Sequence, residues 1–148
     1  MMQFSTRLSV AVHVLLCIAT FEGQSKTTST FLAGSVGVNP VIVRNTLGML
    51  KAAGLVRVDA GVGGAHLARD AEQISLLDVF RAVEESESPF RFHENPNPAC
   101  PVGRNVRAVL AHRLSAANAA MLEQLSQITL RELLDETRAR EEGGASHV

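Results

Sequence analysis

The sequence predicts a mainly α-helical fold with one small β-hairpin. Apolar residues recur at helical spacing in several segments that begin at capping residues. A glycine-rich turn from Gly61 to Gly64 separates two short segments in which apolar and polar residues alternate. A long segment after Pro101 again shows helical spacing. With 148 residues, 46% of them hydrophobic, the chain can form one globular domain with an additional helical arm, but not two full domains.

The first predicted helix follows the capping residues Ser5 and Thr6 and ends before Gly23. Its segment from Leu8 to Phe21 is nearly all apolar. A helix that is apolar on every side is buried on every side, and a small domain offers little cover. We therefore expect a partner subunit or the C-terminal arm to pack on this helix.

Two further helices are predicted between residues 28 and 53. The first runs from about residue 28 to 36 and carries one apolar stripe. Gly37 then permits a left-handed turn, Asn39 is a favoured N-cap, and Pro40 fits the first helical position. The second helix therefore begins at Pro40, and we expect it to run to about Ala53.

A two-stranded hairpin and a fourth helix are predicted next. Apolar and polar residues alternate from Leu55 to Asp59, the glycine-rich tip follows, and the chain returns from Ala65 to Arg69. The segment from Ile74 to Val83 has helical spacing, with Ser75 as its cap.

The rest of the chain is predicted to form a loop, a long helical region and a tail. Pro, Asn, Ser, Glu and Phe dominate residues 84–101, which indicates a long loop. The helical region that follows should extend to about Arg140, with a break near Ser126. We accordingly divide the chain into a compact unit at 1–84, a loop and helix region at 85–140, and a disordered tail at 141–148.

The spacing within residues 31–50 predicts a helix-turn-helix. Two short helices that cross at a wide angle need a small residue at the crossing and a glycine in the turn, and Ala33 and Gly37 stand at that spacing. At 100° per residue, the second helix turns one set of side chains inward: Val43, Thr46, Leu47 and Leu50. The opposite set faces outward: Val41, Arg44, Asn45 and Gly48.

This outward set is suited to reading DNA. Arg can bond guanine in the major groove, Asn can pair with adenine, and Gly48 allows close approach to the DNA backbone. The alternative is an ordinary pair of packed helices with Arg44 as a solvated charge. Three helices followed directly by two strands favour a winged helix-turn-helix, in which the hairpin is the wing and its tip can enter the minor groove. A purely structural hairpin is the alternative for that element.

The charge distribution agrees with a nucleic-acid reader that has a separate assembly part. The whole chain has a net charge of −1, which argues against non-specific coating of nucleic acid. Residues 1–70 carry six basic and three acidic side chains, a net charge of +3, which leaves −4 for the remainder. A polyanion would be attracted to the first half only.

Three motifs resemble the Rrf2 family of bacterial winged helix-turn-helix regulators, which includes the iron–sulfur-cluster regulator and the cysteine-metabolism repressor. They are "AGLV" at 53–56, "GVGGAHLAR" at 61–69 and "ISLLDVFRAVE" at 74–84. The resemblance implies operator binding as a homodimer, with the long C-terminal helix as the dimer interface. It also implies that Arg44 and Asn45 read bases with Val41 lying against them, and that Arg7 and Lys51 hold phosphates.

The sequence departs from the family pattern in two places. Family wings commonly carry an arginine near the tip and an aromatic residue after the glycines, where this chain has Val62 and His66. Arg57 or His66 would have to make any contact with the minor groove instead. Cluster-binding relatives supply three cysteines from the loop before the long helix, but this loop offers only Cys100. We therefore expect no cofactor.

Cys17 and Cys100 are candidate redox sensors. Cys100 stands at a predicted helix N-terminus, where thiol pKa values are lowered, although it can equally be a small residue that fits there. Cys17 lies in the apolar first helix and is either a core residue or a partner in a disulfide between subunits. His93 and His112 flank Cys100 without metal-ligand spacing, so no metal site is expected.

These observations predict a sequence-specific DNA-binding regulator that represses transcription as a homodimer on a palindromic operator, open to a small-molecule or oxidant effector. No segment is long and apolar enough to cross a membrane, and we expect a cytoplasmic protein. An enzyme with Cys100 as nucleophile would need a general base, for which the sequence shows no motif. The remaining alternative is a winged-helix module that binds proteins.

Overall fold

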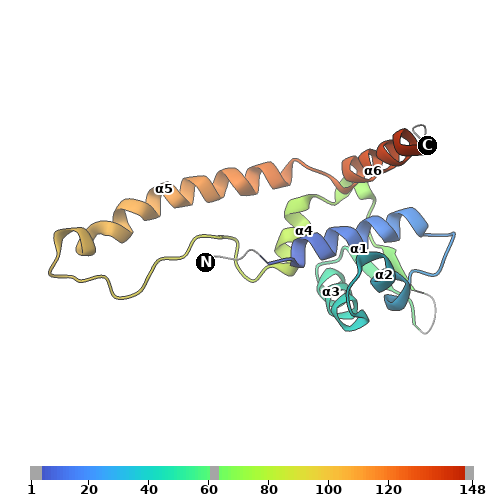
Figure 1. The fold of residues 1–148 in the computed structure, drawn as a ribbon, viewed down its shortest axis with the longest axis horizontal. Coiled ribbons are helices and arrows are strands. Elements are labelled where there is room, and N and C mark those ends of the chain that lie inside the picture. The colour runs from blue at the N-terminus through green and yellow to red at the C-terminus, as the bar shows by residue number, and fades with distance from the viewer. Residues whose placement is uncertain (1–4, 61–63, 146–148) are drawn as a thin grey trace.

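A computed structural model describes residues 5–60 and 64–145 and confirms the mainly helical fold with one small hairpin (Figure 1). The helix-turn-helix region consists of α1 (Arg7–Phe21), α2 (Ser29–Val36) and α3 (Pro40–Ala52). The hairpin of β1 (Val56–Val58) and β2 (Ala65–Leu67) follows. A short 3-10 helix η1 (Ala71–Gln73), which the sequence did not predict, leads to α4 (Leu76–Val83). The chain ends with α5 (Pro101–Ser126) and α6 (Leu130–Ala145).

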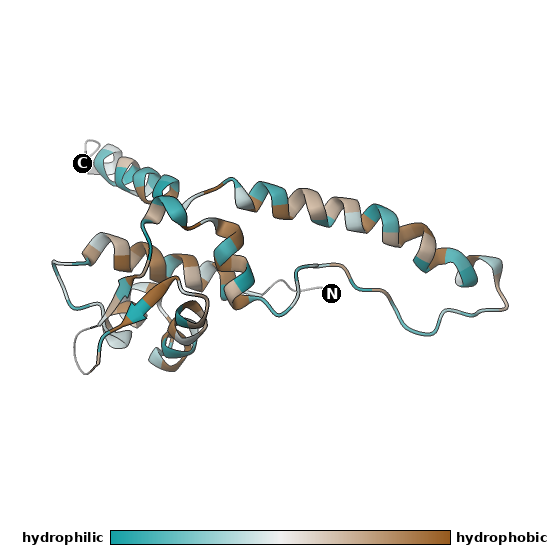
Figure 2. Cartoon of the chain, turned by 180° about the vertical axis from the view of Figure 1, so that it is seen from behind, coloured by the Kyte–Doolittle hydropathy of each residue, from teal (hydrophilic) through white to brown (hydrophobic). Residues whose placement is uncertain are grey.

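The molecule consists of a compact body and one projecting helix. Helix α1 crosses the body, with α2 and α3 on one side and α6 on the other, while α5 extends away with the loop at 84–100 beside it (Figures 1 and 2). The hydrophobic core lies in the body, and no residue of α5 is buried. The body therefore holds the fold together, whereas α5 stands apart from it.

Helix α1 is covered on several sides, as its apolar sequence predicted. Its buried residues contact α2, α3 and α4, and helix α6 supplies further cover. Leu130 and Leu134 of α6 are 1% and 2% exposed, so the C-terminal arm reaches the core of the body. Burying two leucines contributes roughly 3–6 kcal/mol of hydrophobic free energy before entropic costs.

The hairpin is joined to the rest of the body by the segment before α2. Val56 pairs with Leu67, and Val58 with Ala65, in antiparallel register. Ala65 N donates to Thr27 O at 3.0 Å, and the buried Thr27 hydroxyl donates to Ala65 O. The Thr27 backbone thus lies beside β2, which fixes the position of the hairpin relative to α2.

A tight corner joins α5 to α6, close to the break that the sequence predicted near Ser126. Leu76 N donates to Ile128 O, and Leu130 N donates to Ile74 O, both at 2.8 Å. These bonds attach the corner to the start of α4. Helix α6 then continues to Ala145, so residues 141–145 are helical and the expectation of disorder from residue 141 was wrong there. Helix nucleation is the unfavourable step, and it has already taken place once α6 is anchored in the core. Extending the helix by further residues then costs little free energy.

Two sequence predictions concern residues outside the described ranges. These are the turn at 61–63, which includes the wing tip with Val62, and the tail at 146–148.

Candidate nucleic-acid interface

Local capping interactions define the start of α2 and the turn between α2 and α3, where the sequence predicted this turn. The Thr28 hydroxyl accepts a hydrogen bond from Phe31 N at the start of α2. Gly37 ends α2 with φ 80° and ψ 31°, a left-handed conformation that glycine adopts without strain. Asn39 Oδ1 then accepts from Val41 N at 2.9 Å and caps α3, with Pro40 in its first turn. The chain therefore reverses direction between two separate helices.

Helix α3 buries one face and exposes the other, and the buried set is the one that the helical spacing predicted: Val43, Thr46, Leu47 and Leu50. The Thr46 hydroxyl is satisfied because it donates to Ile42 O at 2.8 Å. Arg44, Asn45 and Gly48 lie on the exposed face. Neither Arg44 nor Asn45 makes a side-chain hydrogen bond or ion pair within the described residues, so both are available to a ligand.

The exposed face also carries two large apolar side chains. Val41 is 49% exposed and Ile42 is 45% exposed. Sequence reasoning named Val41 but missed Ile42, although the helical wheel places Ile42 beside Asn45. Exposed branched side chains next to Arg and Asn can contact thymine methyl groups.

The two residues predicted to hold phosphates lie at the ends of different helices. Arg7 is the first residue of α1, and its Nη1 lies 3.7 Å from Glu85 Oε1 in an exposed ion pair. Lys51 is exposed in the last turn of α3. An exposed ion pair contributes little stability, so a phosphate can replace Glu85 as the partner of Arg7.

The two candidate wing residues face the body of the protein. His66 Nδ1 lies 3.2 Å from Glu22 Oε1, and His66 Nε2 lies 2.8 Å from Asp59 Oδ2. Arg57 is the register partner of His66 and borders a cavity between the hairpin, α1 and α6. Both ring nitrogens of His66 are therefore occupied within the protein.

The two cysteines lie in different environments. Cys17 is 5% exposed, and its Sγ donates to Ser35 Oγ at 3.2 Å, while His13 Nε2 lies 3.0 Å from the same oxygen. Cys100 is partly exposed at the N-cap of α5. The backbone N–H groups of Gly103 and Val102 favour its thiolate and lower the pKa of the Cys100 thiol. Since α5 begins far from the body, one chain does not bring the two thiols together (Figure 1).

The loop before α5 packs closely against the start of that helix. The guanidinium of Arg107 lies 5.0 Å from the ring centroid of Phe92, a cation–π contact. A side chain at Gly103 would place its Cβ 2.4 Å from Asn97 O, so only glycine fits there. Cys100 is thus held in a defined turn.

Comparison with known proteins connects this arrangement to gene regulators. A family model described as Rrf2, iron-dependent transcriptional regulator, matches residues 4–136. The chain is 41% identical to the HTH-type transcriptional regulator YwnA of Bacillus subtilis over 131 residues, which cover 88% of this chain and 96% of that protein. A solved structure described as a DNA-binding protein is 38% identical with a TM-score of 0.72, and the match covers 86% of this chain and 98% of that chain.

One further structure supports the fold alone. The structure of CymR, the global cysteine regulator of B. subtilis, is 23% identical with a TM-score of 0.67, and covers 92% of this chain and 98% of that one. Across residues 5–60 and 64–145, no helix combines the length and apolar character needed to span a bilayer.

The residues present do not fit the iron that the family description implies. An iron ion or iron–sulfur cluster needs several thiolate, imidazole or carboxylate donors within reach of one another. In the part of the chain that the structure describes, no three His, Cys, Asp or Glu side chains are so placed. Cys100 is the sole cysteine of the loop before α5.

Proposed function

This chain belongs to the Rrf2 family of DNA-binding transcriptional regulators, and from that premise we propose that it represses transcription by placing α3 of each subunit of a homodimer in the major groove of a palindromic operator. Two recognition helices related by a two-fold axis would contact half-sites about 10 base pairs apart, or a multiple of that distance.

The two faces of α3 carry this proposal. Four buried residues fix the orientation of the helix, and the opposite face presents Arg44 and Asn45 with no partner among the described residues. A guanidinium can make a bidentate bond to guanine, and a carboxamide can do so to adenine. Val41 and Ile42 would lie against bases beside them, and exposed Gly48 has open space around it for a sugar–phosphate backbone.

We assign orientation of the protein on DNA to Arg7, at the start of α1, and to Lys51, in the last turn of the reading helix. At the base of the hairpin we assign a structural role to His66. Because His66 bonds Glu22 on one side and Asp59 on the other, we propose that it holds the hairpin against α1 rather than contacting the minor groove. Arg57 faces the same way, so minor-groove contact would fall to the tip.

We propose that a second copy of this chain packs on α5. Three apolar side chains of α5 are unusually exposed: Val102 at 73%, Val109 at 55% and Leu110 at 39%. An isolated helix of this kind gains little stability by itself, because helices in proteins are held mainly by an apolar face packed against a neighbour. Dimerisation through α5 would supply that neighbour and separate the assembly region from the DNA-binding body at 1–84.

We further propose that oxidation of a thiol regulates the protein, with Cys100 as the sensor. Thiolates react with oxidants, and Cys100 combines partial exposure with a lowered pKa. Cys17 is shielded in the core and bonded to Ser35, so it would react only after the body opens.

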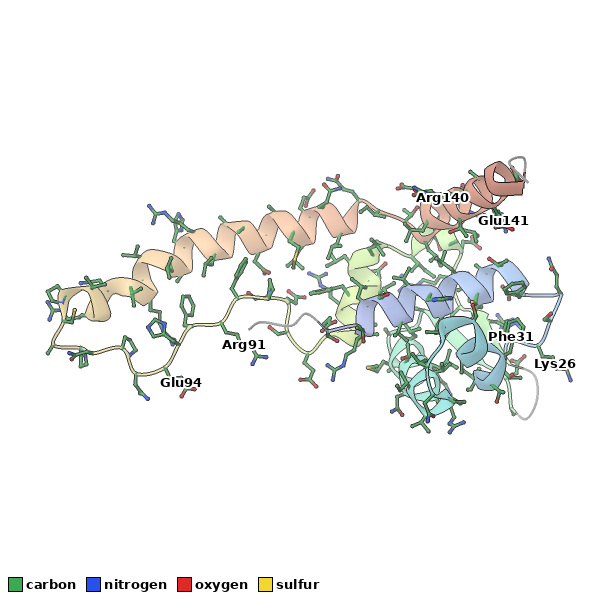
Figure 3. All side chains as sticks on the ribbon, in the orientation of Figure 1. Lys26, Phe31, Arg91, Glu94, Arg140 and Glu141 are labelled. Atoms are coloured by element: carbon green, nitrogen blue, oxygen red, sulfur yellow. The ribbon has the colours of Figure 1, made fainter. Side chains whose placement is uncertain are left out.

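A binding experiment tests the reading face. The full chain is titrated into DNA from upstream of its own gene and into random DNA at several salt concentrations. Arg44→Ala should reduce the preference for the upstream DNA by roughly 10- to 100-fold, since a bidentate base contact contributes about 1–3 kcal/mol. The control Arg140→Ala removes the same charge from α6, on the far side of α1 from α3 (Figure 3).

The control variant should retain full preference. If Arg44→Ala keeps the wild-type preference, α3 does not read the operator through this face. If the wild-type chain shows no preference and no salt dependence, the winged helix serves another partner, such as a protein.

A further inference from the structure

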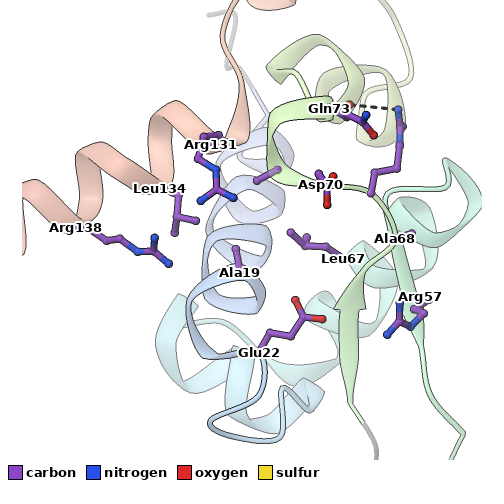
Figure 4. Close-up of a pocket in the computed structure, with 12 residues that line it drawn as sticks. Ala19, Glu22, Arg57, Leu67, Ala68, Asp70, Gln73, Arg131, Leu134 and Arg138 are labelled. Atoms are coloured by element: carbon purple, nitrogen blue, oxygen red, sulfur yellow. Dashed lines mark hydrogen bonds between the residues drawn. The ribbon is translucent and has the colours of Figure 1, made fainter.

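A cavity of about 590 Å³ lies where α1, the hairpin, the segment around η1 and α6 meet (Figure 4). Four arginines line it: Arg57 from β1, Arg69 from the segment after β2, and Arg131 and Arg138 from α6. We call it the arginine cavity. Its volume falls within the range of about 300–1,000 Å³ typical of small-molecule sites.

Positive charge exceeds negative charge around the arginine cavity. Glu22 and Asp70 are the two carboxylates of its lining, and Glu22 already bonds His66. Four arginines and two carboxylates therefore line the cavity; His66 already engages Glu22, and Arg131 forms a long ion pair of 3.9 Å with Glu72, which lies outside the lining.

Several of these guanidinium groups lack full partners in the described residues. Arg57 and Arg138 make no ion pair and no side-chain hydrogen bond there. Arg131 Nε is shielded from solvent without a hydrogen-bond partner, and it forms a long ion pair of 3.9 Å with Glu72 Oε1. Arg69 Nη1 makes one long bond of 3.4 Å to Gln73 O.

The fold alone gives no reason for this arrangement. Like charges around one cavity repel each other, and a shielded N–H without an acceptor costs stability. An oxyanion in the cavity would offset the repulsion, because guanidinium groups bind carboxylate and phosphate oxygens through strong paired hydrogen bonds.

We propose that the arginine cavity binds a small, multiply charged oxyanion, a polycarboxylate or phosphate compound, which bridges the hairpin to α6. Arg57 and Arg69 would hold it from the hairpin side, and Arg131 and Arg138 from α6. Since the hairpin belongs to the DNA-binding body, occupancy changes DNA affinity. This regulatory consequence rests on the proposed operator binding, whereas the site itself does not.

A free small molecule fits the position of the cavity better than DNA does. The cavity is bordered by α6, which lies on the side of α1 opposite α3 (Figures 1 and 2). DNA held by Arg44 and Asn45 would lie beyond α3, with the body of the protein between it and α6.

Calorimetry and thermal unfolding of the full chain test the site. Citrate and pyrophosphate are the two probes, with sodium chloride at equal ionic strength as the reference, and they separate carboxylate from phosphate ligands. At least one probe should bind and raise the melting temperature above the chloride reference. Arg57→Gln and Arg138→Gln should each weaken that binding roughly tenfold, because each removes a charge-assisted hydrogen bond.

Arg140→Gln is the matched control, since it removes the same charge from α6 outside the cavity lining. It should leave binding of the probe unchanged. Equal probe affinity in Arg57→Gln, Arg138→Gln and wild type would overturn the proposal. It would also be overturned if neither probe, at concentrations up to about 10 mM, binds or stabilises the protein more than chloride does. Both variants replace residues without partners in the described fold, so they should remain folded.

DNA binding separates this proposal from the proposed function. With probe absent, Arg57→Gln and Arg138→Gln should keep wild-type DNA affinity; a large loss would show that the cavity contacts DNA phosphates and overturn the small-molecule site. When the probe is added, the DNA affinity of the wild-type chain should change by at least about threefold, whereas the DNA affinity of Arg138→Gln should stay the same. Arg44→Ala should lose operator preference yet bind the probe normally, so the two proposals can fail independently.

Discussion

At the scale of single residues, Cys100 shows how a backbone position changes side-chain chemistry. Its thiol stands at the N-cap of α5, and the N–H groups of the first helical turn favour the thiolate. The tight fit between Gly103 and Asn97 keeps this turn in place. The lowered pKa is therefore a property of the folded chain.

We expect Cys100 to react with iodoacetamide at lower pH in the folded protein than in the unfolded protein. A lowered pKa means that the thiolate, the reactive form, is populated at a lower pH. The modification rate at Cys100 is measured by mass spectrometry across a pH series, with and without urea. Cys17 serves as the internal control, because burial should keep it unmodified until urea is added. A reaction midpoint in the folded protein at or above that in urea would contradict the expectation.

Cys17 itself illustrates a contact that residue types do not reveal. Ser35 Oγ lies between Cys17 Sγ and His13 Nε2, so one hydroxyl joins two side chains of α1 to α2. His13 and Cys17 are four residues apart and share a helical face, which the sequence allows one to deduce. The crossing of α2 over that face supplies Ser35.

At the scale of elements, the attachment of the hairpin depends on one glycine. Gly64 has φ +81°, and a Cβ at this position would lie 2.9 Å from Thr27 N. The Thr27 backbone can approach β2 only because that Cβ is missing. Gly48 is different, since a Cβ there meets nothing within 4 Å.

We expect Gly64→Ala and Gly48→Ala to change stability in opposite directions. Gly64→Ala should lower the free energy of unfolding by about 2 kcal/mol, through an unfavourable left-handed backbone and a clash with Thr27. Gly48→Ala should raise it by roughly 0.5–1 kcal/mol, because Ala favours a helix interior over Gly. Urea unfolding of both variants measures the two values. Equal effects would show that the Thr27 contact does not fix the hairpin.

The sequence predicted that the helix breaks at the corner between α5 and α6, but not which part of the protein the corner contacts. Helical spacing fails near Ser126, and the structure has its corner at 127–129. The hydrogen bonds that fix the corner join residues 128 and 130 to residues 74 and 76, about fifty positions away. Local pattern contains no information about that partner.

At the scale of the whole molecule, α1 separates two surfaces with different chemistry. The side with α3 presents Arg44, Asn45 and two exposed apolar residues, whereas the side with α6 contains the arginine cavity. Helix α5 projects from the body (Figure 2), and Val102, Val109 and Leu110 on it are exposed. Operator reading, assembly and anion binding would therefore use separate surfaces.

We expect Val109→Glu to weaken dimerisation and Val41→Glu to weaken DNA binding. Both replace an exposed valine by a charge, at 55% and 49% exposure. Val109→Glu should raise the dimer dissociation constant roughly a hundredfold, since a charge in an apolar interface is poorly tolerated. Val41→Glu should leave the dimer intact but weaken DNA binding, because a carboxylate on α3 repels phosphate. Analytical ultracentrifugation and DNA titration measure the two properties.

A Val109→Glu chain that still sediments as the wild-type dimer would place the interface elsewhere. A monomeric wild-type chain would remove the dimer proposal altogether. Thermal unfolding of both variants is the control for folding, and neither valine is part of the buried core.

The sequence by itself determined the boundaries of α1 to α4 to within about two residues, and the two faces of α3. Capping by Thr28, Asn39 and Ser75 and the 100° spacing along α3 depend only on residues within a few positions of one another. Such short-range constraints can be read directly from the order of amino acids.

Only the tertiary structure decided which distant side chains meet. It placed His66 between Glu22 and Asp59, and it gathered Arg57 and Arg138 around one cavity although 81 positions separate them in the chain. The tail at 141–145 became helical because Leu130 and Leu134 anchor α6 on α1. These outcomes depend on how the elements pack in three dimensions, and the packing of remote elements is not encoded in any local spacing.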